Sequence, residues 1–388
     1  RLPRRDKLSF LFYGIDRGLK IWQDRGNSRV KNAATRAAEK WMLDHTRYSE
    51  GLGAIYPSMM YLVMALDALG YPRDHPDLMD EVARLNNFFD QIKYLDRSST
   101  SEILIVSDEK SCSYATYDSR MLYYALYNPQ HNLIKMGAPA DHILLDDLAL
   151  LDPAQYKMVV FLNCYHMSNA QRAMVNGLKN SGRLLVWCYA PGYFNERTFS
   201  SANMQDACGI NIEVSNLETF VSPRVTIQTA FHPLGSILNQ AGVTTFGTNQ
   251  NLCKRMWAAD SSASILGFYP GTGFTSMAIS DKGTWKSIWC VTSDMPAAAY
   301  RELARYAGVH IYHEGNDTFY ANTSLVSLHA NGAGNRTINF PAPVTVRDMM
   351  TSQIVATDTT SYTRYYQDAE TVLLQYGATA ATGAWSAY

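Results

Sequence analysis

Short apolar runs alternate with helical periodicity through the middle of the chain. Met158–Leu162 is an apolar run too short for a typical helix, and Leu184–Trp187 is a second one. Between them, apolar residues recur at helical spacing after Ser168 or Asn169 as N-cap, and Gly182 stands where a left-handed C-cap is expected. Two buried strands joined by a helix form a βαβ unit, so this stretch predicts a parallel sheet covered on both faces.

The same alternation continues on both sides of this unit. Ile103–Val106 and His142–Leu145 predict strands before it, with a helix face at Met121–Tyr127 between them. Later strands are predicted at Ile210–Val214, Ser264–Phe268, Thr275–Ile279 and Ser287–Val291. Pro296 then opens a helix that Gly308 ends. The sequence therefore predicts an α/β fold, a flavodoxin-like or Rossmann-like three-layer sandwich.

The two ends of the chain follow other patterns. From Thr318 onward, short runs alternate apolar and polar positions, which predicts a small antiparallel β-sandwich. Residues 7–92 show helical periodicity, and Pro57 and Pro76 fall near the starts of two predicted helices, where proline is tolerated. A polar stretch, residues 96–102, lies between the helical and the α/β patterns and is a predicted linker.

These changes of pattern divide the chain into domains. At 388 residues it is long enough for two or three of ordinary size. We expect a helical segment at residues 1–96, an α/β domain at 101–315, a β-sandwich at 316–377 and a frayed tail at 378–388.

Composition and charge narrow the classes of function. The 34 Lys and Arg residues nearly balance the 35 Asp and Glu residues, so the charge does not favour nucleic acid or an anionic membrane as a partner. The six cysteines are scattered, without CxxC or zinc-type spacing, which predicts reduced thiols and neither a metal site nor a cofactor. The longest apolar run, Met59–Leu66, is far shorter than the ~20 residues of a membrane span. No signal peptide is visible, so a cytoplasmic location is the default expectation.

Polar residues at the carboxyl ends of the predicted strands form a candidate ligand crevice, because parallel α/β sheets bind ligands at that edge. The crevice comprises Asp108, Glu109, Asp146, Asp147, Cys164, His166, Tyr189 and Tyr193. Ala190-Pro191-Gly192, between the two tyrosines, predicts a rigid turn. No catalytic residue is assigned among them.

A structural role is the favoured interpretation of the two adjacent acidic pairs in this crevice. Adjacent Asp146 and Asp147 would point to opposite faces of an extended chain, so a turn in which one caps the next element is favoured over an acid–base pair. Asp108 and Glu109 receive the same interpretation. His232, before a proline, is a lone loop histidine with no predicted partner.

Residues 101–376 resemble the C-terminal part of large bacterial β-galactosidase-like glycoside hydrolases. The resemblance is nearly colinear and rests on stretches such as IVSDEKS (105–111), GAPADHILLDDL (137–148), YKMVVFLNCYHM (156–167) and GRLLVWCYAPGY (182–193). It implies a class I glutamine-amidotransferase-like α/β domain and a β-sandwich, packed behind a catalytic TIM barrel that holds both catalytic carboxylates. Residues 1–100 do not predict a (β/α)₈ barrel, so the resemblance carries over a fold and no catalytic residue.

The same resemblance bears on Cys164 and His166, because a thiol beside a histidine can be a nucleophile with its base. Glutamine amidotransferases flank their cysteine with glycines in a tight elbow, whereas Asn163 and Tyr165 flank this one. A buried structural thiol is therefore the favoured interpretation of Cys164, and Cys188 fails the same test.

Residues 8–85 resemble squalene–hopene cyclases. The matching stretches are GIDRGLKIW (14–22), RAAEKWMLDH (36–45), GAIYPSMMY (53–61) and ALDALGYPRDHP (65–76). That family forms double barrels of paired helices and protonates a polyene with an Asp-x-Asp-Asp motif, which this sequence does not contain. Thr46 and Leu52 stand where the family's repeat has Gln and Trp. The resemblance therefore implies a degenerate cyclase-like segment without cyclase chemistry.

Three hypotheses of function follow. The favoured one is a non-catalytic accessory or structural portion of a glycoside hydrolase, without independent activity, with carbohydrate as the expected ligand and self-association through the α/β domain as the expected assembly. The second is an amidotransferase-like or hydrolytic enzyme that works at the strand ends. The third is a squalene–hopene cyclase fragment, in which residues 1–95 are the meaningful part. The abrupt join near residue 96 leaves a natural fusion and an assembly chimera both open.

Overall fold

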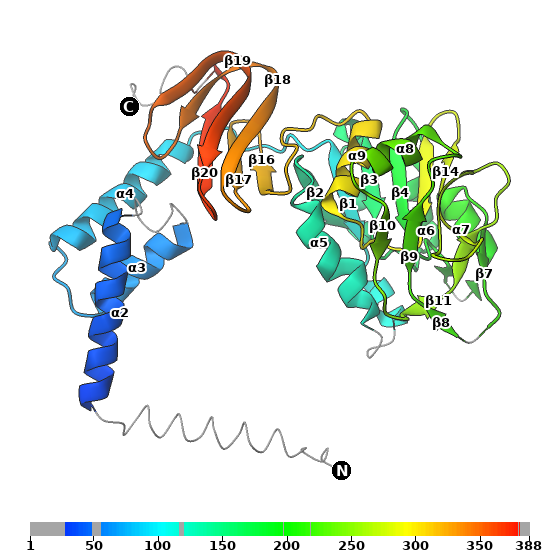
Figure 1. Cartoon of the computed structure of the whole chain (residues 1–388), viewed down its shortest axis with the longest axis horizontal. Coiled ribbons are helices and arrows are strands. Elements are labelled where there is room, and N and C mark those ends of the chain that lie inside the picture. The colour runs from blue at the N-terminus through cyan, green and yellow to red at the C-terminus, as the bar shows by residue number, and fades with distance from the viewer. Residues whose placement is uncertain are drawn as a thin grey trace. The chain divides into compact units, whose positions relative to one another are not determined.

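The computed structural model describes residues 28–48, 56–115, 120–196, 198–217, 219–378 and 380. The chain divides into two compact units, Arg1–Tyr94 and Leu95–Tyr388, and Figure 1 labels most of their helices and strands. Predictions that concern residues 7–27, including the stretch 14–22, lie outside the described residues.

The described part of the first unit is helical, as its periodicity predicts. It contains α2 (Ser28–Tyr48), α3 (Tyr56–Ala68) and α4 (Pro76–Ile92). Pro76 is the first residue of α4, and Gly70, whose φ is +82°, follows the end of α3. Trp41 keeps 57% of its surface exposed, and among the side chains that the structure describes in this unit the buried apolar cluster comprises Leu62, Leu66 and Leu78.

A nine-stranded sheet forms the centre of the second unit. Five neighbouring strands run parallel, in the order β2 (Ala140–Leu144), β1 (Ile103–Ser107), β3 (Met158–Phe161), β4 (Leu184–Cys188) and β15 (Lys286–Cys290). Four strands extend the sheet in antiparallel fashion beyond β15: β14 (Thr275–Asp281), β13 (Ser264–Phe268), β9 (Arg224–Ile227) and β10 (Thr245–Gly247). The prediction of an α/β fold is confirmed, and the large sheet is mixed, because antiparallel strands extend its parallel part.

The βαβ unit predicted from the sequence is β3, α6 (Asn169–Asn176) and β4. Ser168 begins α6 with a capping box, as its residue type suggests. The prediction for Gly182 was wrong, because the helix ends at Gly177 in a right-handed conformation with a φ of −62°. Gly182 does have a φ of +70°, but it lies in the turn before β4, where its N–H donates to the Thr284 carbonyl at 2.8 Å.

Three two-stranded ribbons lie outside the central sheet. They pair β5 (Phe194–Asn195) with β6 (Thr198–Phe199), β7 (Ile212–Val214) with β12 (Met256–Ala258), and β8 (Phe220–Val221) with β11 (Cys253–Lys254). The strand predicted at Ile210–Val214 is thus shorter than expected and belongs to a ribbon. Its partner follows more than 40 residues later in the chain, and an apolar run does not encode such a pairing.

The helices of the α/β part fall into two groups. α5 (Asn128–Leu133) and α8 (Pro233–Gln240) both contact α9 (Ala297–Tyr306), whereas α6 contacts α7 (Ser201–Cys208). A π-helical turn, η4 (Tyr123–Tyr127), leads into α5, and short 3₁₀ turns occur at η2 (Lys110–Tyr114), η5 (Leu145–Leu150) and η6 (Pro153–Gln155). The sheet interior is apolar, and Phe161 stacks on Trp187 with 4.1 Å between ring centroids.

The C-terminal strands form one antiparallel sheet. Its order is β16 (Thr318–Ala321), β17 (Leu325–His329), β20 (Thr371–Tyr376), β18 (Gly334–Asp348) and β19 (Ile354–Tyr366). The antiparallel prediction is confirmed, but a sandwich would need two sheets. The long strand β18 keeps the sheet continuous, because it pairs with β19 along most of its length and with β20 at its end.

The predicted linker, residues 96–102, is attached to the second unit. The Ser98 carbonyl accepts a hydrogen bond from the Thr323 N–H at 3.1 Å, and the Ser99 hydroxyl donates to Asp141 at 2.8 Å. These contacts fix the start of the unit to both the α/β part and the C-terminal sheet.

Candidate functional site

A cavity of about 350 Å³ lies at the carboxyl ends of the parallel strands, and we name it the aromatic cavity. Its lining includes Tyr114, Tyr165, Tyr189, Tyr193, Phe199 and Phe220. Tyr165 comes from the loop after β3, and Tyr189 directly follows β4. Because β3 and β4 are parallel neighbours, their carboxyl ends place these two tyrosines at one edge of the sheet.

Tyr189 is fixed by its backbone and its hydroxyl. Its φ is +59°, a strained value for a residue with a side chain, and its N–H donates to the Cys290 carbonyl at 2.8 Å. Its carbonyl accepts from the Trp289 indole at 2.7 Å, and its hydroxyl donates to the Lys254 carbonyl at 3.3 Å. Burial raises the pKa of Tyr189, like that of Tyr165, well above its usual value, so both hydroxyls stay neutral.

Aromatic rings from other segments complete the cavity. Tyr114 stacks on Phe194 with 4.4 Å between centroids, and Tyr193 meets Phe194 edge-on at 5.1 Å. Phe199 and Phe220 are 65% and 47% exposed. Of these five residues, the sequence prediction contained only Tyr193. The aromatic density of residues 189–199 was a usable signal, whereas Phe220 reaches the cavity through a ribbon that the sequence does not reveal.

His166 lies beside the aromatic cavity, in a buried position. Only 1% of its surface is exposed, and neither ring nitrogen has a hydrogen-bond partner within the described part of the chain. Its ring stacks on Tyr114 at 5.5 Å, and its backbone N–H donates to the Ser111 hydroxyl at 2.8 Å. Burial, and secondarily the nearby Lys110 charge, lower the pKa of His166, so the ring is neutral at pH 7.

Cys164 is an interior thiol. It is 1% exposed, and its Sγ lies 3.8 Å from the Val106 carbonyl oxygen, which accepts its weak hydrogen bond. Burial, and secondarily the Asp108 charge, raise the pKa of Cys164 well above 9.0, the usual value for a thiol. The described structure contains no hydrogen bond between this thiol and His166, so the two residues are not arranged as a nucleophile with its base. Cys188 is also buried, and burial raises its pKa as well.

The acidic candidates do not line the aromatic cavity. Asp108 is 3% exposed and accepts the Ser111 N–H at 2.6 Å, which is the capping turn that we predicted, and Glu109 beside it is exposed. The capping prediction for Asp146 and Asp147 was wrong: both are exposed residues in the first turn of η5. The Asp146 carboxylate instead accepts from the Gln171 amide at 2.6 Å, because η5 lies next to α6.

The turn Ala190-Pro191-Gly192 shapes one side of the site. Gly192 has a φ of +60°, and its N–H donates to the Cys164 carbonyl at 2.8 Å. The buried Arg172 guanidinium donates to the Gly192 carbonyl, and a Cβ at Gly192 would lie 2.8 Å from Arg172. Arg172 also pairs with Asp206 on α7 at 2.9 Å, so α6 and α7 hold this turn in place.

His232 has a role that the sequence analysis missed. It precedes α8, and its Nδ1 accepts the Leu234 N–H at 3.1 Å, so it caps that helix. The six cysteines are free thiols. Within the described residues, no group of three or more His, Cys, Asp or Glu side chains is arranged to hold a metal ion.

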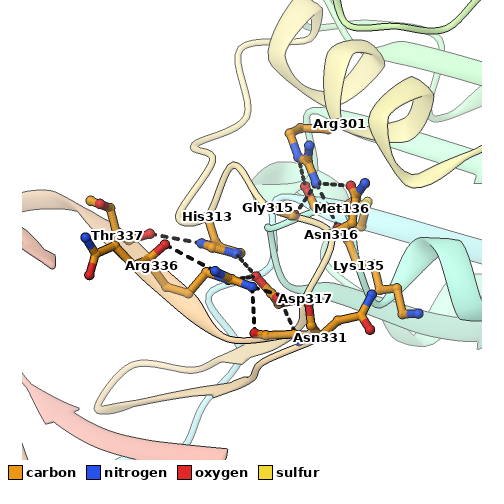
Figure 2. Close-up of polar contacts among 12 residues, drawn as sticks. Lys135, Met136, Arg301, His313, Gly315, Asn316, Asp317, Asn331, Arg336 and Thr337 are labelled. Carbon is orange, nitrogen blue, oxygen red and sulfur yellow. Dashed lines mark hydrogen bonds and ion pairs between the residues drawn. The ribbon is translucent and has the colours of Figure 1, made fainter. Parts of the chain in front are cut away.

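A second polar cluster, which we name the Asp317 cluster, joins the α9–β16 connection to the C-terminal sheet (Figure 2). Asp317 is 2% exposed, and its carboxylate accepts from His313 at 2.7 Å and from Arg336 at 2.6 Å. It also accepts the Asn331 N–H at 2.7 Å, while the other nitrogen of His313 lies 2.9 Å from the Thr337 carbonyl oxygen. A carboxylate and a carbonyl can only accept, so whichever ring nitrogen of His313 carries a proton donates to its partner.

Arg301 fixes the same connection from the α/β side. Its guanidinium donates to the carbonyl oxygens of Lys135 and Met136, both at 3.0 Å, and to Asn316 and Gly315 in the connection (Figure 2). Within the described structure, no side-chain atom of His313, Asp317, Arg336 or Arg301 is buried without a hydrogen-bond partner. We therefore interpret the Asp317 cluster as a structural clamp.

Comparisons with known proteins confirm both resemblances that the sequence suggested. The family model for the squalene-hopene cyclase N-terminal domain matches residues 2–91. Solved structures of β-galactosidases match the fold over 78% of the chain. That share must come mainly from the second unit, because Arg1–Tyr94 holds 94 of the 388 residues. No curated protein matches the chain in sequence.

Three of these structures serve as examples. The β-galactosidase from Bacillus circulans sp. alkalophilus aligns with a TM-score of 0.57 at 15% identity, over 45% of its own chain. A catalytic mutant of Gan42B, a GH42 β-galactosidase from G. stearothermophilus, aligns with a TM-score of 0.56 at 12% identity, over 44% of its chain. The cold-adapted β-galactosidase from Rahnella sp. R3 gives 0.53 at 15% identity, over 45%. The chain thus spans less than half the length of these enzymes, and the likeness is one of fold.

Among the described residues, no helix combines the length and apolarity that crossing a membrane requires.

Proposed function

We propose that Leu95–Tyr388 is a non-catalytic accessory portion related to GH42 β-galactosidases, and that carbohydrate is its ligand. The fold likeness to β-galactosidases supports the relationship. The observation that supports the absence of catalysis is the composition of the aromatic cavity. Glycoside hydrolysis uses two carboxyl groups that flank the scissile bond, about 5–10 Å apart, and no Asp or Glu is among the described residues that line this cavity.

The α/β part belongs, in this proposal, to the flavodoxin-like class I glutamine amidotransferase type. Its parallel strands follow the order β2-β1-β3-β4-β15, which is the 2-1-3-4-5 order of flavodoxin-like sheets. The domain limits of the sequence analysis are retained as proposals. The limit near residue 315 is supported by the two buried apolar clusters, of which one extends to Ile311 and the other begins at Tyr312.

The crevice prediction is retained in part. Tyr189 and Tyr193 line the aromatic cavity, and His166 stacks on Tyr114, which lines it. The exposed or hydrogen-bonded carboxylates and the buried Cys164 are left out of the proposed site. An amidotransferase-like activity is not favoured, because it would need Cys164 exposed and activated, whereas it is buried and has a raised pKa.

The helical unit is, in our proposal, a cyclase-related segment without cyclase chemistry. The family match supports the relationship. Protonation of a polyene requires a strong acid, and the Asp-x-Asp-Asp motif that supplies it in the family does not occur in this sequence.

The proposal is tested with the purified full chain and an aryl β-galactoside, with release of the phenol followed by absorbance. We expect no turnover above the rate of a heat-denatured sample. Turnover that copurifies with the chain through two orthogonal columns, and persists in a Cys164→Ala variant, would contradict the non-catalytic assignment. Turnover that disappears in that variant would favour a thiol-dependent hydrolase.

A further inference from the structure

The aromatic cavity contains a hydroxyl that the protein leaves without a partner. Tyr165 lines the cavity and is only 3% exposed, and its hydroxyl makes no hydrogen bond to any described residue. Its oxygen is not fully enclosed by protein, so it keeps access to the open space of the cavity, where water can pair with it. The Tyr165 hydroxyl is therefore a recognition group available to a molecule that enters the cavity.

The outer part of the cavity offers apolar surface. Phe199, Phe220 and Tyr114 keep 65%, 47% and 40% of their surfaces exposed, although they lie around one cavity. A soluble protein normally covers such a group of rings or uses it for binding. The volume of about 350 Å³ lies at the lower end of the range for small-molecule sites, which suits a ligand of one or two rings.

The charge of the cavity favours an uncharged ligand. Lys254 is the single charged residue in the described lining, and its carbonyl, not its side chain, holds Tyr189. The hydroxyls of Tyr165 and Tyr189 remain neutral at pH 7, because burial raises their pKa values. A phosphorylated nucleotide would need a cradle of N–H groups or several cations, whereas the described lining contains one charged residue.

Two kinds of uncharged ligand remain to be compared: a wholly apolar chain and a ring that carries hydroxyl groups. An isoprenoid chain would cover the exposed rings but would bury the Tyr165 hydroxyl permanently without a partner. A pyranose ring has a C–H face that can lie on an aromatic ring and hydroxyl groups at its edge that can pair with Tyr165. It matches both features of the cavity.

We propose that the aromatic cavity is a binding site for a neutral pyranose ring, stacked on Phe199 and Phe220 and hydrogen-bonded to the Tyr165 hydroxyl. This inference rests on the proposed carbohydrate association and specifies its site and its ligand chemistry. It requires no catalytic activity.

The test measures binding to the full chain by isothermal titration and ligand-observed saturation-transfer NMR. The probes are methyl β-galactoside, methyl β-glucoside, galactose 6-phosphate, farnesol and FMN. Two variants address the cavity: Tyr165→Phe removes the hydroxyl and keeps the ring, and Phe199→Ala removes an exposed stacking surface. Tyr365→Phe and Phe231→Ala are matched controls, because these residues are 55% and 51% exposed and lie outside the cavity lining.

We expect a neutral methyl glycoside to bind at least as tightly as galactose 6-phosphate. Tyr165→Phe and Phe199→Ala should each weaken binding by about fivefold, whereas the controls leave it unchanged. Phe199 is largely exposed, so Phe199→Ala keeps the test valid even if Tyr165→Phe disturbs folding.

Three results would overturn the inference: no glycoside binding at millimolar concentration, glycoside binding that both cavity variants leave intact, or occupation of the cavity by farnesol or FMN with no glycoside bound. The aryl β-galactoside assay is independent of these outcomes. Turnover together with cavity binding would refute the non-catalytic assignment alone, and absence of both turnover and binding would refute this inference alone.

Discussion

Replacing Asp317 with Asn is expected to destabilise the connection between α9 and the C-terminal sheet. The carboxylate is 2% exposed and receives hydrogen bonds from His313, Arg336 and the Asn331 N–H. An amide has one accepting oxygen, and its NH₂ group can only donate. At least one of the three donors would therefore face another donor in the variant.

The expected loss of stability in Asp317→Asn follows from how deeply the partners of Asp317 are buried. Removing one member of a buried ion pair costs about 3–5 kcal/mol, because the remaining charge stays buried and uncompensated. The His313 side chain is 3% exposed, but that of Arg336 is 18% exposed and keeps some contact with water. We therefore expect the lower end, a loss of about 3 kcal/mol.

Urea unfolding followed by circular dichroism measures this loss in the full chain. Hydrogen exchange gives a local measurement: the Thr337 amide and its neighbours on β18 should exchange about a hundredfold faster if they open through this cluster. Glu314→Gln is the matched control. Glu314 lies in the same connection and pairs with Arg305, but the two side chains are 56% and 45% exposed, so its loss should change stability by less than about 1 kcal/mol.

The pH dependence of the stability difference between wild type and Asp317→Asn gives an independent check of the role of this carboxylate. Burial raises the pKa of Asp317, but the Arg336 guanidinium, the Asn331 N–H and His313 more than offset it and hold that pKa below 3.8, its usual value. A carboxyl with a lowered pKa contributes stability that is fully present above the unfolded-state value of about 3.9 and is lost as the pH falls through the folded-state value. The gap between wild type and Asp317→Asn should therefore narrow below about pH 4. Equal stability of the two proteins at pH 7, or a gap that acid leaves unchanged, would refute this account of the cluster.

Three further predictions concern folding and thiol reactivity. Expressed alone, Leu95–Tyr388 should melt cooperatively by circular dichroism, whereas Arg1–Tyr94 should not, because the described side chains of that unit bury a core of three leucines, at ~1.5–3 kcal/mol each, which falls short of an ordinary domain core. The reverse outcome would mean that the helical unit organises the fold. Gly137→Ala should lower the melting temperature strongly, because the φ of Gly137 is +81° and a Cβ there would lie 1.7 Å from the His313 carbonyl oxygen. A change in the free energy of unfolding below about 1 kcal/mol would contradict this packing. Cys164 should react slowly with a thiol probe at pH 7, because it is 1% exposed and burial raises its pKa well above 9.0. Rapid labelling at pH 6 would favour the amidotransferase-like alternative.

Local signals were sufficient to locate most of the regular elements. Ser264–Phe268 is a strand over the predicted range, Ser168 caps α6, and Pro296 precedes the first residue of α9. These features depend on residues within one or two turns of each other, so the sequence carries them directly. Gly182 shows the limit of this approach: its positive φ was predicted, but the turn that requires it was not the helix end.

The predicted crevice and the aromatic cavity share only some of their residues. Tyr189 and Tyr193 follow a predicted strand and line the aromatic cavity, whereas Asp146 and Asp147 follow another strand and remain exposed outside it. Phe220 enters the cavity because β8 pairs with β11, which comes more than 30 residues later.

The sequence by itself determined most of the central strands and helices, and that the region from Thr318 onward is built of short antiparallel strands. Only the tertiary structure decided that those strands form a single sheet, that aromatic residues from the ribbons line one cavity with Tyr165, and that His313, Asp317 and Arg336 meet. Burial, capping and periodicity are properties of neighbouring residues. A cavity or an ion-pair cluster depends instead on contacts between distant segments, and these are set by how the whole chain packs.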